Sequence, residues 1–147
     1  MKPAAFSYIR AESLGEALDA LAQYGEDARI IAGGQSLGPM LNMRLAAPEV
    51  LIDIMGLKDL DRIEFTDDGA MAAACVTQAR FMGRLELPRA QPLLYESMPW
   101  IGHVQTRSRG TICGSLANAD PAAELPLLLS TIGGVVIAQS KRGQRGI

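Results

Sequence analysis

The first part of the chain alternates short apolar segments with stretches whose apolar positions recur at helical spacing. Apolar segments at 6–10, 29–32 and 50–54 predict three strands. Between the second and third of these strands, a helix is predicted that starts at Ser36 and is ended by Pro48. The helix between the first two is predicted by apolar residues at i, i+3, i+4 and i+7: Leu14, Ala17, Leu18 and Leu21. This order predicts a β-α-β-α-β lobe over residues 1–55, with parallel strands.

The remaining residues, 56–147, predict a second lobe of a different kind. Residues 62–65 and 71–76 flank turn formers at 67–69, which indicates a hairpin. Residues 105–120 are rich in turn formers and are expected to be a loop. Helices are predicted after Thr77 and before Pro88, from Pro92 to about Pro99, and at residues 122–132.

The last segment predicts one strand with a short partner. Residues 135–138 have strand character, and residues 141–143 read as a turn. Only residues 144–147 remain for the partner strand, fewer than the ~5–6 residues of a typical strand. We therefore expect an incompletely paired strand at this end of the lobe.

Composition excludes several classes of function. Apolar residues make up 48% of the chain and charged residues 20%, and the net charge is -2, so no basic surface for nucleic acid is expected. Its longest uncharged run, residues 125–138, falls short of the ~20 apolar residues that cross a bilayer, and we expect a soluble, cytoplasmic protein without a membrane span. Two cysteines and one histidine, with no CxxC pair, predict no metal or iron–sulfur site on this chain.

The first candidate binding motif is a glycine pair at a predicted junction of strand and helix. Gly33 and Gly34 let the backbone turn sharply and present N–H groups to a ligand. A helix that starts at Ser36 would favour a phosphate there. The motif is neither a GxGxxG fingerprint nor a P-loop, which requires a lysine. A tight turn capped by Ser36 remains an alternative interpretation.

The second candidate motif runs from residue 109 to residue 121. Gly110 and Gly114 bracket the hydroxyl groups of Thr111 and Ser115, and the Asn118 amide follows. Such a segment offers backbone N–H groups and hydroxyls to a pyrophosphate without a lysine or arginine on the loop. It is equally compatible with a surface loop. Arg107 and Arg109 are expected to be solvated, and Cys75 to be a buried small apolar residue.

The two motifs together resemble a known family. AGGQSL at 32–37 and RGTICGSLANADPAAELP at 109–126 are similar to the FAD-binding subunits of molybdenum hydroxylases, which include the carbon monoxide dehydrogenase medium subunit and the xanthine dehydrogenase flavin domain. The resemblance implies an α+β fold of α/β character, namely the two-lobed FAD-binding fold of the vanillyl-alcohol-oxidase or PCMH type. Family subunits continue further, so we expect a fragment whose C-terminal part is missing.

The resemblance also implies which residues bind FAD. One glycine loop from each lobe embraces the pyrophosphate, Glu124 hydrogen-bonds the ribose, Ile101 packs on the cofactor, and Asp120 orients backbone or contacts the flavin side. Where the family has two glycines this chain has Cys113-Gly114, and a left-handed backbone at Cys113 would compromise binding. The implied cofactor-binding residues are Ala32, Gly33, Gly34, Gln35, Ser36, Leu37, Ile101, Thr111, Ile112, Cys113, Gly114, Ser115, Asp120 and Glu124.

The implied function is electron relay by an oxidoreductase subunit. A molybdopterin-containing large subunit oxidises the substrate, a small subunit carries iron–sulfur clusters, and FAD passes the electrons to an external acceptor. No catalytic acid or base is expected on this chain, because the cofactor carries the chemistry. Two alternatives are a stand-alone flavin oxidoreductase of related fold and a truncated interaction module without redox function.

Overall fold

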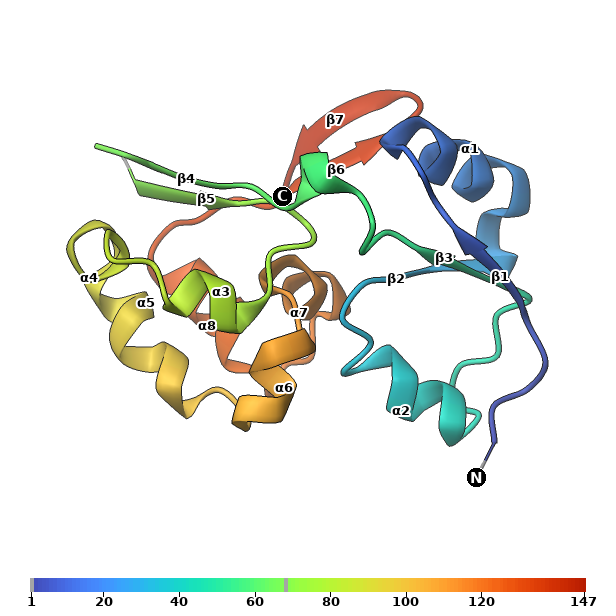
Figure 1. The fold of residues 1–147 in the computed structure, drawn as a ribbon, viewed down its shortest axis with the longest axis horizontal. Coiled ribbons are helices and arrows are strands. Elements are labelled where there is room, and N and C mark those ends of the chain that lie inside the picture. The colour runs from blue at the N-terminus through green and yellow to red at the C-terminus, as the bar shows by residue number, and fades with distance from the viewer. Residues whose placement is uncertain (1, 68) are drawn as a thin grey trace.

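The computed structural model describes residues 2–67 and 69–147. Its N-terminal part contains a three-stranded sheet, two α-helices and a short 3-10 turn (Figure 1). All three strands and both helices lie where the apolar pattern predicts them. The elements are β1 (Ser7–Arg10), α1 (Leu14–Tyr24), η1 (Gly25–Asp27), β2 (Ala28–Ile31), α2 (Leu37–Asn42) and β3 (Val50–Asp53).

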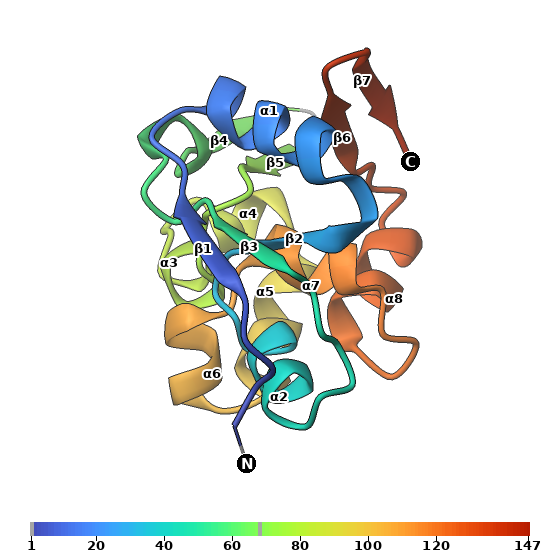
Figure 2. The same ribbon diagram turned by 90° about the vertical axis from the view of Figure 1, so that its right-hand side faces the viewer.

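The sheet has the strand order β1-β3-β2, and both pairs are parallel, as predicted. Val50 at the start of β3 pairs with Ser7 on one side and with Ala28 on the other. Figure 2 shows α1 on one side of this sheet and α2 on the other. The parallel register brings the carboxyl ends of β2 and β3 to the same edge, where the chain leaves β2 for α2.

Helix α1 begins at a serine cap. The Ser13 hydroxyl accepts a hydrogen bond from the Glu16 N–H at 3.1 Å, and the Glu16 carboxylate accepts one from the Glu12 N–H at 2.7 Å. The first bond satisfies a backbone donor of the first turn, and the second binds the N–H that precedes the capping residue Ser13. The helix ends at Gly25, whose φ of 52° lies in the left-handed region.

The C-terminal part is mostly helical, with one hairpin at each end. The predicted first hairpin is present, although its second strand begins at Gly69 rather than at residue 71, and Asp68 of its predicted turn lies outside the described residues. The elements are η2 (Lys58–Leu60), β4 (Ile63–Thr66), β5 (Gly69–Ala72), α3 (Gln78–Met82), α4 (Leu87–Ala90), α5 (Pro92–Ser97), η3 (Met98–Trp100), α6 (Val104–Arg109), α7 (Ile112–Asn118), α8 (Glu124–Thr131), β6 (Ile137–Ser140) and β7 (Gly143–Gly146).

Two predictions for this part are wrong. Residues 105–120 are not one loop, because they contain most of α6 and all of α7. The last strand is also not incompletely paired: β6 pairs with β7 along its whole length, and Val136 and Ile147 exchange two further backbone hydrogen bonds. The predicted strand at 135–138 lies two residues later, at Ile137–Ser140.

Buried apolar side chains form two clusters. The first lies between α1 and the parallel sheet and includes Ile52 and Cys75, and the second lies among the helices of the C-terminal part and includes Val76 and Met98. Cys75 and Val76 are consecutive, so the two clusters adjoin along the chain at this point. Within the described residues no helix has the length and apolar character needed to cross a membrane.

Candidate cofactor-binding site

The first glycine loop connects β2 to α2 at the edge of the parallel sheet (Figure 1). Gly34 has a φ of 68°, a left-handed conformation that side chains rarely adopt. Its carbonyl accepts a hydrogen bond from the Gly38 N–H at 2.9 Å, and the Gln35 side chain donates to the Gly33 carbonyl at 3.0 Å. Ser36 precedes the helix as predicted, but its hydroxyl makes no capping hydrogen bond. The turn is thus held by its own backbone and by Gln35.

The second motif is anchored to the start of α3. The N–H of Gln78 donates to the Gly110 carbonyl at 2.8 Å, and the N–H of Ile112 donates to the Val76 carbonyl at 3.1 Å. Between these bonds Thr77 and Thr111 form an antiparallel bridge. Since Val76 is completely buried, this pairing fixes the motif to the core of the C-terminal part.

The second motif is the first turn of a helix rather than an open loop. The Thr111 hydroxyl caps α7 by accepting a hydrogen bond from the Gly114 N–H at 3.0 Å. A Cβ at Gly114 would lie 2.6 Å from that hydroxyl oxygen, so a side chain at this position would displace the Thr111 hydroxyl from its capping geometry. Cys113 lies inside α7 and is not among the non-glycine residues with positive φ, so replacing the family's usual glycine there strains no backbone.

The two glycine motifs are in direct contact. A Cβ at Gly33 would overlap the carbonyl oxygen of Arg109 and lie 2.8 Å from the Cα of Gly110. Gly110 also lies close to Gln35, because a Cβ there would be 3.5 Å from the Gln35 Cγ. Two segments that are far apart in the sequence are therefore in contact. They can approach this closely because Gly33 has no side chain.

The contact region presents backbone donors. In the described part of the chain, the N–H groups of residues 33–36 and those of Thr111 and Cys113 donate to no protein acceptor. Consecutive N–H groups without side-chain obstruction are the usual means of holding phosphate oxygens. The residues of both motifs therefore fit an anionic group such as a pyrophosphate.

Ile101 is held by a buried arginine. The Arg107 side chain, only 8% exposed, donates to the carbonyls of Pro99, Ile101 and Gly102 at 3.1, 2.9 and 3.0 Å. The expectation that Arg107 is solvated is wrong, because these three carbonyls replace its water. Ile101 itself is buried in the second apolar cluster.

Asp120 and Glu124 lie beyond α7 and are exposed. The Asp120 carboxylate accepts a hydrogen bond from the Ala122 N–H at 2.8 Å and so orients the backbone before α8, whose first residue is Glu124. Among the described residues, no hydrogen bond joins Asp120, Glu124 or Ile101 to either glycine motif. The structure brings the two motifs together but does not link these three residues to them.

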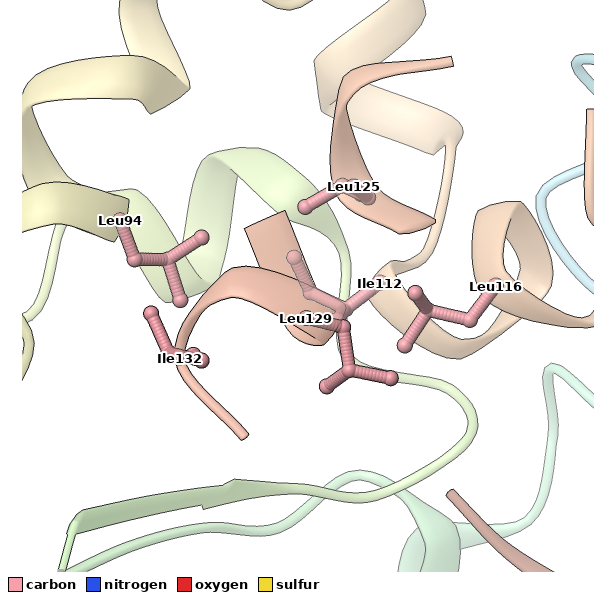
Figure 3. A pocket seen from close by; sticks show the side chains of 6 residues that line it. All are labelled: Leu94, Ile112, Leu116, Leu125, Leu129 and Ile132. Atoms are coloured by element: carbon pink, nitrogen blue, oxygen red, sulfur yellow. The ribbon is translucent and has the colours of Figure 1, made fainter. Parts of the chain in front are cut away.

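An apolar pocket lies beneath α7 and α8 (Figure 3). Ile112 points into it, so this residue faces the core and reaches the candidate site only through its backbone. Six aliphatic side chains line the pocket, which suits packing rather than a charged ligand. They are Leu94, Ile112, Leu116, Leu125, Leu129 and Ile132.

Sequence reasoning missed two residues near the site. Gln78 and Arg107 are buried polar side chains, one behind Gly110 and one behind Ile101. Nothing in the local pattern distinguishes them from solvated residues, because both stand in segments of mixed polarity. Their roles follow only from tertiary contacts.

Comparison with known proteins extends over nearly the whole chain. The chain is 45% identical over 147 residues to 6-hydroxypseudooxynicotine dehydrogenase complex subunit alpha of Paenarthrobacter nicotinovorans and covers 50% of that protein. It is 39% identical over 146 residues to caffeine dehydrogenase subunit beta of Pseudomonas sp. (strain CBB1). It is 36% identical over 145 residues to the carbon monoxide dehydrogenase medium chain of Afipia carboxidovorans. The chain covers 50% of each of these two proteins. The chain thus spans about half the length of the curated relatives it matches.

Solved structures share the fold. Reconstituted CO dehydrogenase from Oligotropha carboxidovorans superimposes with a TM-score of 0.96 at 35% identity, and quinoline 2-oxidoreductase from Pseudomonas putida 86 with 0.94 at 39%. Each match covers 100% of this chain and 51% of the other. The family described as "FAD binding domain in molybdopterin dehydrogenase" matches residues 4–147. With both glycine motifs in contact on this fold, the chain belongs to the family of FAD-binding domains of molybdopterin dehydrogenases.

Proposed function

We propose that the chain binds FAD with the pyrophosphate held by residues 32–37 and residues 111–115. The contact of Gly33 with Arg109 and Gly110 supports this, because it joins the two chain segments that carry N–H groups without a protein acceptor. In this proposal residues 1–55 form the first lobe and residues 56–147 the second, each contributing one motif.

Three further residues complete the proposed site. Glu124 is exposed at the start of α8, and its carboxylate suits the paired hydroxyls of a ribose. Asp120 braces the turn before α8 and would position Glu124 through the backbone. In this proposal Ile101 packs on the cofactor; it is buried in the second cluster and held in place by Arg107.

The proposed role is electron relay in an oxidoreductase complex. FAD, when bound, supplies the redox chemistry, since it exchanges electrons singly or in pairs. The residues of this chain bind and orient it, and none acts as an acid or base. The proposed partners are a molybdopterin large subunit, an iron–sulfur small subunit and an external acceptor. The relatives' names, which include a medium chain and a medium subunit, support such an assembly, and we place it in the cytoplasm.

The contact between the two glycine motifs is the observation that carries the proposal. The purified chain is incubated with FAD, passed through a desalting column and examined for visible flavin absorption and stoichiometry. We expect retained FAD at about one per chain. A colourless protein would favour an interaction module without redox function. Reduction of the retained flavin by a small substrate without partner subunits would favour a stand-alone oxidoreductase.

A further inference from the structure

Gln78 lies directly behind the second glycine motif. It is the first residue of α3, its side chain is buried, and the residue is only 5% exposed. Its N–H holds the Gly110 carbonyl at 2.8 Å. Its side-chain amide packs on the same glycine, because a Cβ at Gly110 would lie 3.4 Å from the Gln78 Nε2. Gln78 therefore contacts Gly110 through both backbone and side chain.

This glycine is also where the two motifs meet. The Gln35 Cγ is 3.5 Å from the Cβ position of Gly110, and Gly33 packs against Gly110 from the first motif. Gln78 approaches the same point from α3, with its Nε2 3.4 Å from that Cβ position. Its amide thus stands at the junction of the two motifs that we propose hold the cofactor.

The Gln78 side chain has an unsatisfied acceptor. Its Oε1 is enclosed and accepts no hydrogen bond from any described residue. A buried amide oxygen without a donor destabilises the folded state, and native proteins contain few such groups. Within the described residues no other buried side-chain nitrogen or oxygen lacks a partner, which singles out this position.

We propose that Gln78 is a cofactor-binding residue whose Oε1 accepts a hydrogen bond from a sugar hydroxyl of FAD. This inference rests on the proposed function. An amide oxygen can only accept, so it cannot pair with phosphate oxygens, but hydroxyls of the ribose and of the ribityl chain flank the pyrophosphate. Because Oε1 is enclosed, binding requires the Gln78 side-chain amide to shift toward the junction, where its Nε2 already lies beside Gly110.

The first test uses Gln78→Met, which keeps the length and removes the amide. Without cofactor, its melting temperature should equal or exceed that of the wild type, because an unsatisfied oxygen is lost. Its Kd for FAD should rise roughly 3- to 10-fold, the loss expected for one neutral hydrogen bond. Gln91→Met, a half-buried glutamine of the same region, is the matched control and should leave the Kd unchanged.

The second test needs no variant and follows the wild-type side-chain amide signals by NMR. The Gln78 amide should shift on addition of FAD, while that of Gln91 stays in place. A shift produced by ADP assigns the donor to the ribose, and one produced by FMN assigns it to the ribityl chain. An unmoved Gln78 signal with FAD bound, or a Gln78→Met protein that binds FAD normally, overturns the inference. Absence of FAD binding by the wild type overturns the proposed function instead.

Discussion

Gly33 and Gly34 are neighbours, but they are required for different physical reasons. Gly34 adopts a left-handed backbone with a φ of 68°, whereas Gly33 lacks positive φ and touches the backbone of the second motif. A side chain at Gly34 strains its own residue. A side chain at Gly33 would push the first glycine motif away from Arg109 and Gly110, so its effect extends across the site.

Gly34→Val should weaken FAD binding because a β-branched residue disfavours a left-handed backbone, at a cost of about 1–2 kcal/mol. Gly34→Asn is the matched variant, since asparagine tolerates this conformation better. Fluorescence titration with FAD should give a larger Kd for valine than for asparagine. Equal and unchanged Kd values for both would remove Gly34 from the site.

Cys75 provides a prediction about pH. Its thiol donates to the Ile54 carbonyl at 3.1 Å, and burial raises the pKa of Cys75 from 9.0 to about 11. Because this pKa is higher in the folded than in the unfolded chain, the contribution of the neutral thiol to the free energy of unfolding is complete below pH 9.0. That contribution is lost as the pH rises through about 11. Urea unfolding at pH 8, 9.5 and 11 should show the decline, and Cys75→Ala should flatten it. Because burial also raises the pKa of Cys113, Cys113→Ala serves as the comparison.

At the scale of elements, the N-terminal part could be predicted closely and the C-terminal part less so. Strands predicted at 6–10 and 50–54 match β1 and β3 because each apolar segment lies between clear turn and cap signals. Helices α6 and α7 were missed because their segment is rich in glycine and serine. Their stability comes from the Thr111 cap, the Arg107 contacts and the pairing with α3, which local composition does not encode.

The candidate site also combines features that could be predicted from local sequence with features that depend on tertiary contacts. The glycines of both motifs were identified from sequence, because their spacing and their resemblance to a family are local properties. Two features emerged only from the helical geometry of α7: a side chain at Gly114 would crowd the Thr111 hydroxyl, and Cys113 adopts an ordinary helical backbone that does not need glycine. Gln78 emerged only from its contact with Gly110.

The start of α7 gives a prediction for two adjacent positions. Gly114→Ala should destabilise the chain and weaken FAD binding, because its Cβ would crowd the Thr111 hydroxyl and disrupt a cap worth about 0.5–2 kcal/mol. Cys113→Gly should not improve binding, since Cys113 is helical, and glycine there should lower the free energy of unfolding by roughly 0.5–1 kcal/mol. Thermal melts and FAD titration of both variants decide this. Tighter FAD binding by Cys113→Gly would contradict the assigned helix.

At the scale of the whole molecule, two apolar clusters are joined at consecutive residues. Cys75 belongs to the first cluster and Val76 to the second, and the second motif pairs with the backbone at Val76. The contact between Gly33 and Gly110 joins the same two parts a second time. The candidate site therefore lies where the two parts of the molecule meet, and changes there should affect both.

The C-terminal hairpin predicts how the isolated chain behaves. Val135, Ile137 and Ile147 are 61%, 62% and 66% exposed on or beside it, and an exposed apolar strand invites association. Size-exclusion chromatography should show species larger than a monomer, and Ile137→Lys should raise the monomer fraction. Leu85→Lys removes an equally apolar but distant side chain that is 94% exposed, and should change the profile less. A monomeric wild-type chain would show that the hairpin is not a contact surface.

If the two glycine motifs form one FAD site, Gly33→Ala should disrupt that site. The added Cβ would overlap the Arg109 carbonyl and force the motifs apart. Gly38→Ala is the matched control, because it lies in α2 with nothing within 4 Å of its Cβ position. Fluorescence titration with FAD should give a Kd at least about tenfold higher for Gly33→Ala, a loss of ~1.4 kcal/mol, and an unchanged Kd for Gly38→Ala. Equal FAD affinities for the two variants and the wild type would show that the contact between the two glycine motifs does not form the FAD site.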